Sequence, residues 1–136
     1  MKIDQDYLKR LLDACQASNK PTFNIEDLKA SGFDYDAPEF EFHMAILDDH
    51  GFIRQDDGDP GFGLIKSVDG FLSWSVLPLR LTASGHAFID AVQNPEVWSK
   101  TKAAAKKVGG VGLDLLFQIA KAEAKRFAAE KLGLPL

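Results

Sequence analysis

Residues 80–102 read RLTASGHAFIDAVQNPEVWSKTK and contain the transition that decides the fold. A short alternating stretch typical of a β-strand ends here, and an amphipathic helix begins almost at once. Thr82 or Ser84 can cap that helix, because a hydroxyl oxygen accepts hydrogen bonds from the free amides of the first turn. We expect Gly85 to let this turn lie close to the strands.

Apolar spacing predicts six helices: three before the strand-to-helix junction, the one that begins there, and two more after it. Capping residues, Pro and Gly mark their ends. The predicted helices are one through Cys15, then about 25–30, 38–50, 83–93, 95–108 and 112–132.

Between the third and fourth helices the apolar period changes to two. The predicted strands are FIRQ (52–55), LIKSV (64–68), FLSWSV (71–76) and LRLT (79–82). Asp69–Gly70 predicts a two-residue hairpin turn, because such turns need positive φ angles. The segment 56–61 consists of turn-forming residues.

Helix, short helix, helix, β-ribbon and helix is the order of a winged helix. The sequence therefore predicts an α+β fold that is mostly α. It would be a winged helix-turn-helix with a β-hairpin wing and a C-terminal helical extension. We expect residues 1–94 to form the winged-helix domain and residues 95–136 to extend the same domain. A length of 136 residues suits one domain.

Three segments carry a family resemblance: HMAILDDHGFI (43–53), RLTASGHAFIDAVQNPEVWSKTK (80–102) and AKRFAAEKLGL (124–134). Together they resemble the bacterial and phage family known as domain of unknown function 2513. The leucine pair of the family appears here as Ile46–Leu47, and its Gly-Leu-Ile as Gly51–Ile53. The resemblance implies a small winged-helix-like protein, often encoded by a phage or prophage. It implies no activity.

Charge is distributed unevenly along the chain. Residues 99–136 hold eight basic against three acidic residues, whereas residues 31–60 hold nine acidic residues and Arg54 as the one base. Such asymmetry bears on binding partners rather than on the fold. The nine acidic residues are Asp34, Asp36, Glu39, Glu41, Asp48, Asp49, Asp56, Asp57 and Asp59.

The acidic segment is unsuited to DNA. A winged helix usually places its third helix in the major groove, and its affinity comes largely from Lys and Arg near phosphates. Here the third helix and its flanks hold five acids and no base, and the expected wing tip at 54–60 adds three acids. The basic alternative is Lys100, Lys102, Lys106 and Lys107, which can equally belong to a solvated helix.

We therefore expect a non-enzymatic regulatory protein, of phage or mobile-element type, that binds a basic protein partner through the nine acidic residues. Phe33, Tyr35, Phe40 and Phe42 lie among these acids and can serve as anchors. At least one of Phe40 and Phe42 should be in the core, since they lie about 200° apart on a helix. The alternatives are a DNA-binding transcription regulator and an inhibitor of a host nucleic-acid-binding machine by charge mimicry.

The sequence favours neither catalysis nor a cofactor. His43, His50 and His86 lack the spacing of a metal site, and no cysteine pair exists. Ser84 is better used as a helix cap than as a nucleophile, and Cys15 lies on an apolar helical stripe, where a small core residue is expected. We expect no metal ligand, no cofactor and no catalytic residue.

The totals also bear on location and assembly. No stretch has the length of a membrane span, and the N-terminus lacks the apolar core of an export signal. A single cysteine fits a reducing compartment. We expect a cytoplasmic protein without membrane contact. The apolar stripe of the last helix makes a homodimer through that helix a possibility.

Overall fold

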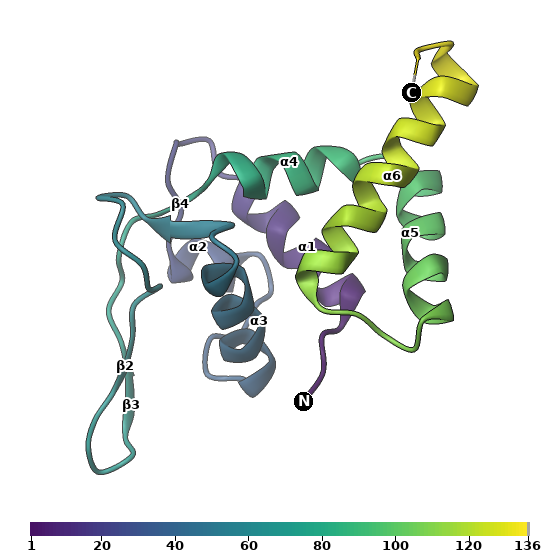
Figure 1. Cartoon of the computed structure of the whole chain (residues 1–136). Coiled ribbons are helices and arrows are strands. Elements are labelled where there is room, and N and C mark those ends of the chain that lie inside the picture. Colours follow the sequence, from purple (N-terminus) through teal and green to yellow (C-terminus); the bar gives the residue numbers. More distant parts are fainter. Residues whose placement is uncertain (136) are drawn as a thin grey trace. The chain divides into compact units, whose positions relative to one another are not determined.

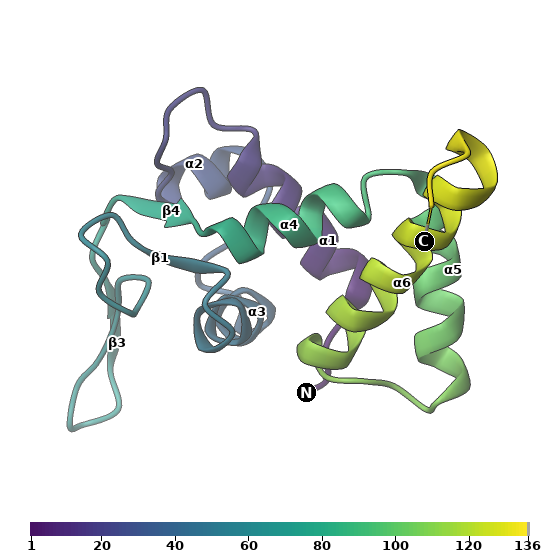
Figure 2. The same cartoon turned by 45° about the horizontal axis from the view of Figure 1, so that its top comes forward.

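The computed structural model describes residues 1–135. The fold is α+β and mostly helical, with two small antiparallel sheets (Figures 1 and 2). The chain divides into two compact units, Met1–Gly85 and His86–Leu136, which are called unit 1 and unit 2 below. The expected boundary at residue 94 stays a prediction.

Unit 1 begins with the three helices that the sequence predicts. The Asp4 side chain caps the first by accepting from the Tyr7 amide, 3.0 Å away. Asn24 and Asp27 form a reciprocal capping box at the start of the second. Pro38 opens the third. The helices are α1 (Gln5–Gln16), α2 (Ile25–Ala30) and α3 (Pro38–Asp49).

Four short strands follow α3 and form two separate antiparallel pairs. The strands are β1 (Ile53–Gln55), β2 (Leu64–Lys66), β3 (Leu72–Trp74) and β4 (Leu79–Leu81). β1 pairs with β4 in the interior of unit 1, where Ile53 lies opposite Leu81. β2 pairs with β3 to form a hairpin, residues 64–74, that extends away from α3 (Figure 1).

The turn of this hairpin differs from the expected one. The Gly70 amide donates to the Ser67 carbonyl over 3.0 Å, and the Ser67 amide donates to the Phe71 carbonyl over 2.9 Å. Among these residues only Gly70 has a positive φ, at 86°. The loop therefore has three residues, a turn that ends in a glycine bulge. The two-residue prediction was wrong because its turn needs positive φ at Asp69 as well.

The acidic segment 56–61 is a separate turn between β1 and β2 and not the tip of the hairpin. The expectation of an acidic wing tip at residues 54–60 was therefore wrong. Both segments carry turn chemistry, and the sequence did not distinguish which of the two turns projects.

The core of unit 1 is built from the inner faces of its helices and the β1–β4 pair. Phe40 is fully buried, whereas Phe42 is half-buried, which confirms that one of the two lies in the core. The other large side chains of unit 1 that are fully buried are Leu8, Leu11, Leu12, Ile25, Leu28, Met44, Leu47, Ile53 and Leu79.

The junction between β4 and α4 (Ala83–Ala91) confirms the role expected of Thr82 and Gly85. The Thr82 hydroxyl donates to the Gly51 carbonyl and accepts from the Gly85 amide, which is 3.2 Å away. A Cβ at position 85 would lie 2.4 Å from the Phe52 carbonyl oxygen. Position 85 therefore requires glycine, because any side chain there would collide with the backbone of Phe52.

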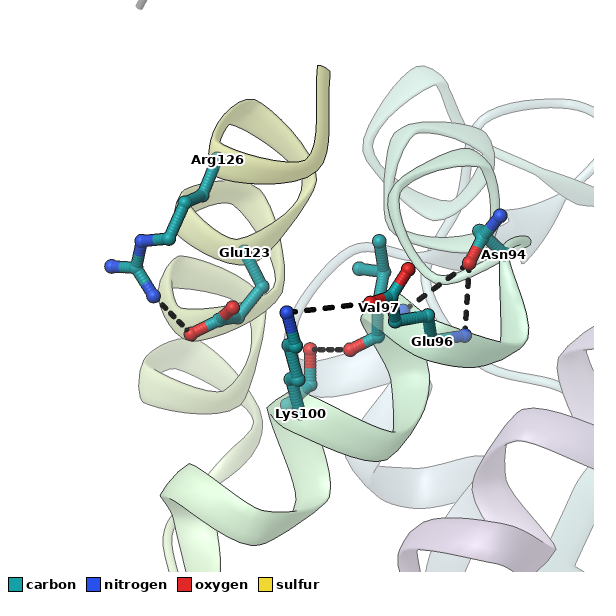
Figure 3. A network of polar contacts seen from close by, with 7 residues as sticks. Asn94, Glu96, Val97, Lys100, Glu123 and Arg126 are labelled. Carbon is teal, nitrogen blue, oxygen red and sulfur yellow. Dashed lines mark hydrogen bonds and ion pairs between the residues drawn. The ribbon is translucent and has the colours of Figure 1, made fainter. Parts of the chain in front are cut away.

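Unit 2 contains the rest of α4 and two further helices, α5 (Pro95–Lys107) and α6 (Leu113–Leu132), which lie side by side. Asn94 caps α5 by accepting from the Glu96 and Val97 amides (Figure 3). Phe88 of α4 meets Phe117 of α6 edge to face, with ring centres 5.7 Å apart. Dimerisation through α6 stays a prediction.

Candidate protein-interaction surface

Two of the nine predicted acidic residues hold neighbouring segments in place. Glu41 forms an ion pair of 2.9 Å with Lys66 of β2. Asp48 accepts from the Gly61 amide, also over 2.9 Å. Both carboxylates lie on one side of α3, since their positions differ by about 20° on a helix. Glu41 therefore attaches the hairpin to α3, and Asp48 attaches the 56–61 turn to the same helix.

The other seven acidic residues are exposed and gather at the two ends of α3. The first acidic group is Asp34, Asp36 and Glu39. The second acidic group is Asp49, Asp56, Asp57 and Asp59. Glu39 and Asp49, the members of the two groups that lie on α3, are ten residues apart, which is about 15 Å along the helix axis. The nine acids therefore form two groups and not one continuous patch.

Local hydrogen bonds orient part of each acidic group. Asp34 accepts from the Asp36 amide, and Asp57 accepts from the Asp59 amide, each over 2.9 Å. These are side-chain turns of the kind that Asp favours in loops. None of the seven carboxylates forms an ion pair with another residue in the described chain. Unit 1 as a whole has fifteen acidic against eight basic residues.

The hairpin is attached between the two acidic groups. The Trp74 ring of β3 contacts Tyr35, which lies within the first group, at 5.7 Å between ring centres. It contacts Phe40 of α3 at 5.7 Å and Phe62, just beyond the second group, at 5.9 Å. These ring contacts place the base of the hairpin next to both groups.

The hairpin also exposes large apolar side chains, which sequence reasoning missed. Val68 at the turn is fully exposed, Phe71 is 74% exposed and Ile65 is 50% exposed. Leu72 and Val76 are exposed as well. One signal in the sequence could have indicated this exposure. β2 and β3 form a hairpin of two strands, and no further strand follows them directly to cover its second face.

The four lysines of the basic segment lie on α5 but not on one face. Lys100 and Lys107 lie about 20° apart around the helix, whereas Lys102 is about 200° from Lys100. Lys100 pairs with Glu96 over 3.5 Å (Figure 3), and the Lys102 ammonium lies 5.5 Å from the Trp98 ring centre. Lys106 and Lys107 are exposed.

The histidines and Cys15 were weighed for metal binding and catalysis. No cluster of three or more metal-ligating side chains occurs within residues 1–135. His43 is buried and uses both ring nitrogens: Nδ1 lies 2.7 Å from the Glu39 carbonyl, and Nε2 accepts from the Asp4 amide at 3.0 Å. A carbonyl only accepts, so the proton is on Nδ1. Cys15 is buried, and burial raises the pKa of its thiol.

Unit 2 has an open groove of about 470 Å³ beside α6. Pro95, Val97, Phe127 and Leu132 contribute to its lining, and Asp90 is its one titratable lining residue.

Comparison with known proteins identifies a family for most of the chain. The family model described as "Hypothetical protein (DUF2513)" matches residues 2–112. No curated protein and no solved structure matches the chain. Among residues 1–135, no helix has the length and apolarity needed to cross a membrane.

Proposed function

The chain belongs to the DUF2513 family, and we propose that it is a non-enzymatic regulatory protein that binds a basic protein partner through its acidic surface. The contact surface consists of the first and second acidic groups at the two ends of α3. Residues 1–94 act as a winged helix-turn-helix domain, and residues 95–136 extend it.

The order of elements supports the winged-helix assignment. α1, α2 and α3 precede the strands, and α4 follows β4 directly. The β1–β4 pair lies in the core, and the β2–β3 hairpin has the place of a wing. In this assignment α3 is the helix that would enter a DNA groove, and it carries acids where DNA-binding proteins carry Lys and Arg.

The observation that carries the proposal is the set of seven exposed carboxylates without a cationic partner in the described chain. Like charges held together on a fold repel each other and are relieved when a surface of opposite charge approaches. Phosphates would be repelled by the same surface, which disfavours nucleic acid as the direct partner. If the basic partner normally binds nucleic acid, this contact would make the protein a competitor by charge mimicry.

A random peptide library displayed on phage tests the proposal. Selection on the immobilised full-length chain should enrich peptides rich in Lys and Arg, and added salt should weaken their binding. The variant D34N/D36N/E39Q should reduce the affinity of these peptides by about tenfold or more, because it removes three attracting charges.

The control variant D90N/D114N/E130Q removes the same number of exposed acids from unit 2. It should bind the selected peptides as the unmodified chain does. Enrichment of acidic or uncharged peptides, or equal losses in the two variants, would contradict the proposal.

A further inference from the structure

We propose that the β2–β3 hairpin is the apolar anchor of this contact, and that Val68 and Phe71 enter an apolar recess in the basic surface of the partner. This inference rests on the proposed function, because it names the element that would give the acidic surface its specificity. The acidic groups beside the base of the hairpin would form the charged part of the interface.

The exposed apolar area of the hairpin is the first reason. Phe71 is 74% exposed, Val68 is fully exposed, and Ile65 and Leu72 are each half exposed or more. Ile65 and Phe71 lie on the face that turns away from α3, because they alternate with Lys66 and Leu72 in the pairing register. Leu72 lies on the opposite face, beside Lys66. Single exposed apolar residues are ordinary, but Val68 in the turn, with Ile65 and Phe71 on one face, puts three of them on one short projecting element, which marks an interaction site.

The rigid base of the hairpin is the second reason. The Trp74 ring packs against Tyr35, Phe40 and Phe62, and the Lys66–Glu41 ion pair holds the other strand.

Gly63 adds a close backbone contact at the same place. Its carbonyl accepts from the Ser75 amide over 2.8 Å, and a Cβ at position 63 would lie 2.3 Å from the Ser75 carbonyl oxygen. A two-stranded hairpin is marginally stable alone, so these contacts orient it before any partner arrives. An anchor that is already ordered loses less conformational freedom on binding.

Charge selects the kind of partner. The base of the hairpin lies beside both acidic groups, and Asp69 lies in its turn. The Ser67 hydroxyl donates a hydrogen bond to Asp69, whose carboxylate adds a negative charge at the tip. Anionic lipid and nucleic acid would both be repelled, as would the identical acidic surface of a second copy. A basic protein surface with an apolar recess fits both the charge and the apolar side chains.

The proposed arrangement matches how protein interfaces distribute their energy. Large apolar and aromatic side chains at the centre contribute most of the affinity, and a polar rim surrounds them. Phe71 and Val68 would supply the apolar contact at the projecting end of the hairpin, and the two acidic groups beside its base would supply the charged contact. Truncating a side chain that is a binding hot spot changes the affinity by about tenfold or more.

The same displayed peptide library tests the anchor, now with the variant V68S/F71S. Both side chains are exposed, so the substitutions should leave the fold and its circular dichroism unchanged. On the unmodified chain we expect enriched peptides to combine Lys or Arg with large apolar residues. Their affinity should fall about tenfold or more in V68S/F71S. The matched control V108S/L115S removes two exposed apolar residues of unit 2 and should bind normally.

Three results would overturn the anchor. In the first, the enriched peptides carry basic residues alone and bind V68S/F71S as well as the unmodified chain. This result would exclude the hairpin as the anchor and leave the proposed function intact. Loss of self-association in V68S/F71S, measured by sedimentation velocity, would assign the hairpin to a second copy. Binding of the unmodified chain to phosphatidylglycerol vesicles, lost in V68S/F71S, would assign it to a lipid surface.

Discussion

The carbonyl oxygen of Phe52 occupies the space that a side chain at position 85 would need, since a Cβ there would lie 2.4 Å away. The carbonyl also accepts from the Thr82 amide over 2.9 Å, so it cannot move without losing a hydrogen bond. This contact joins the end of α3, the β1–β4 pair and the start of α4 at one point.

Replacing Gly85 with Ala should destabilise the protein by about 1–3 kcal/mol, the usual range for inserting a group into a filled site. Urea denaturation followed by circular dichroism measures the change. The control Gly112→Ala adds the same methyl group where nothing lies within 4 Å and φ is −71°. It should change the free energy of unfolding by less than about 1 kcal/mol. Equal effects of the two substitutions would disprove the contact argument.

Replacing His43 with Leu should also destabilise the fold. Leu fills a similar volume but leaves the Asp4 amide and the Glu39 carbonyl without their ring partners. An unsatisfied buried polar group costs about 1–3 kcal/mol. His50→Leu is the control, since His50 is exposed at the end of α3. A His43→Leu variant as stable as the unmodified chain would show that the two hydrogen bonds contribute nothing net.

Cys15 should be nearly inert in the native protein. Burial raises the pKa of its thiol, and the thiolate is the reactive form. Labelling with iodoacetamide near pH 8 should be about 100-fold or more slower than in urea, because it requires transient opening. The control is a Ser73→Cys substitution in a Cys15→Ala background, which has one exposed thiol. This thiol should be labelled as fast in the native protein as in urea. Fast labelling of native Cys15 would contradict its burial.

Alkaline pH should weaken the fold. Burial raises the pKa of the Cys15 thiol well above its ordinary range. The unfolded chain therefore loses this proton first, so the contribution to stability is complete below about pH 9 and declines above it. Burial, followed by the nearby Glu39 charge, raises the pKa of Tyr7 and acts with the same sign. Urea midpoints between pH 8 and 10 should fall, and less steeply in Cys15→Ala.

Fluorescence anisotropy with a mixed-sequence DNA duplex separates the protein-binding proposal from a DNA-binding regulator. We expect no binding at about 50 mM salt, because unit 1 is acidic and the four lysines of α5 do not share a face. Binding that falls steeply at about 200 mM salt would contradict this expectation. Neutralising Lys100, Lys102, Lys106 and Lys107 would then show whether α5 is the DNA-binding element.

Most of the secondary structure could be predicted from local signals. Apolar periodicity places the helices of residues 1–135, and caps such as Asn24 and Pro38 place their starts. The hairpin turn was predicted in place but not in type. A two-residue and a three-residue turn share the Asp-Gly signal and differ in the backbone angle of Asp69, which depends on the pairing of the flanking strands.

For the candidate site, the sequence predicted which residues are acidic but not how they are arranged in space. The excess of acids between residues 31 and 60 is visible in sequence, but their division into two groups is not. Glu41 and Asp48 look like the other acids until the structure pairs them with Lys66 and the Gly61 amide. The exposed face of the hairpin was missed because an apolar strand in sequence looks the same whether or not another element covers it.

The sequence by itself determined the order of the helices and strands, the glycine at position 85 and the sign of the charge on each half of the chain. These follow from local propensity and from counting, which need no knowledge of distant contacts. Only the tertiary structure decided that Trp74 attaches the hairpin between two acidic groups and that Phe71 is left uncovered. Burial and exposure depend on residues far apart in the chain, so they are decided by packing.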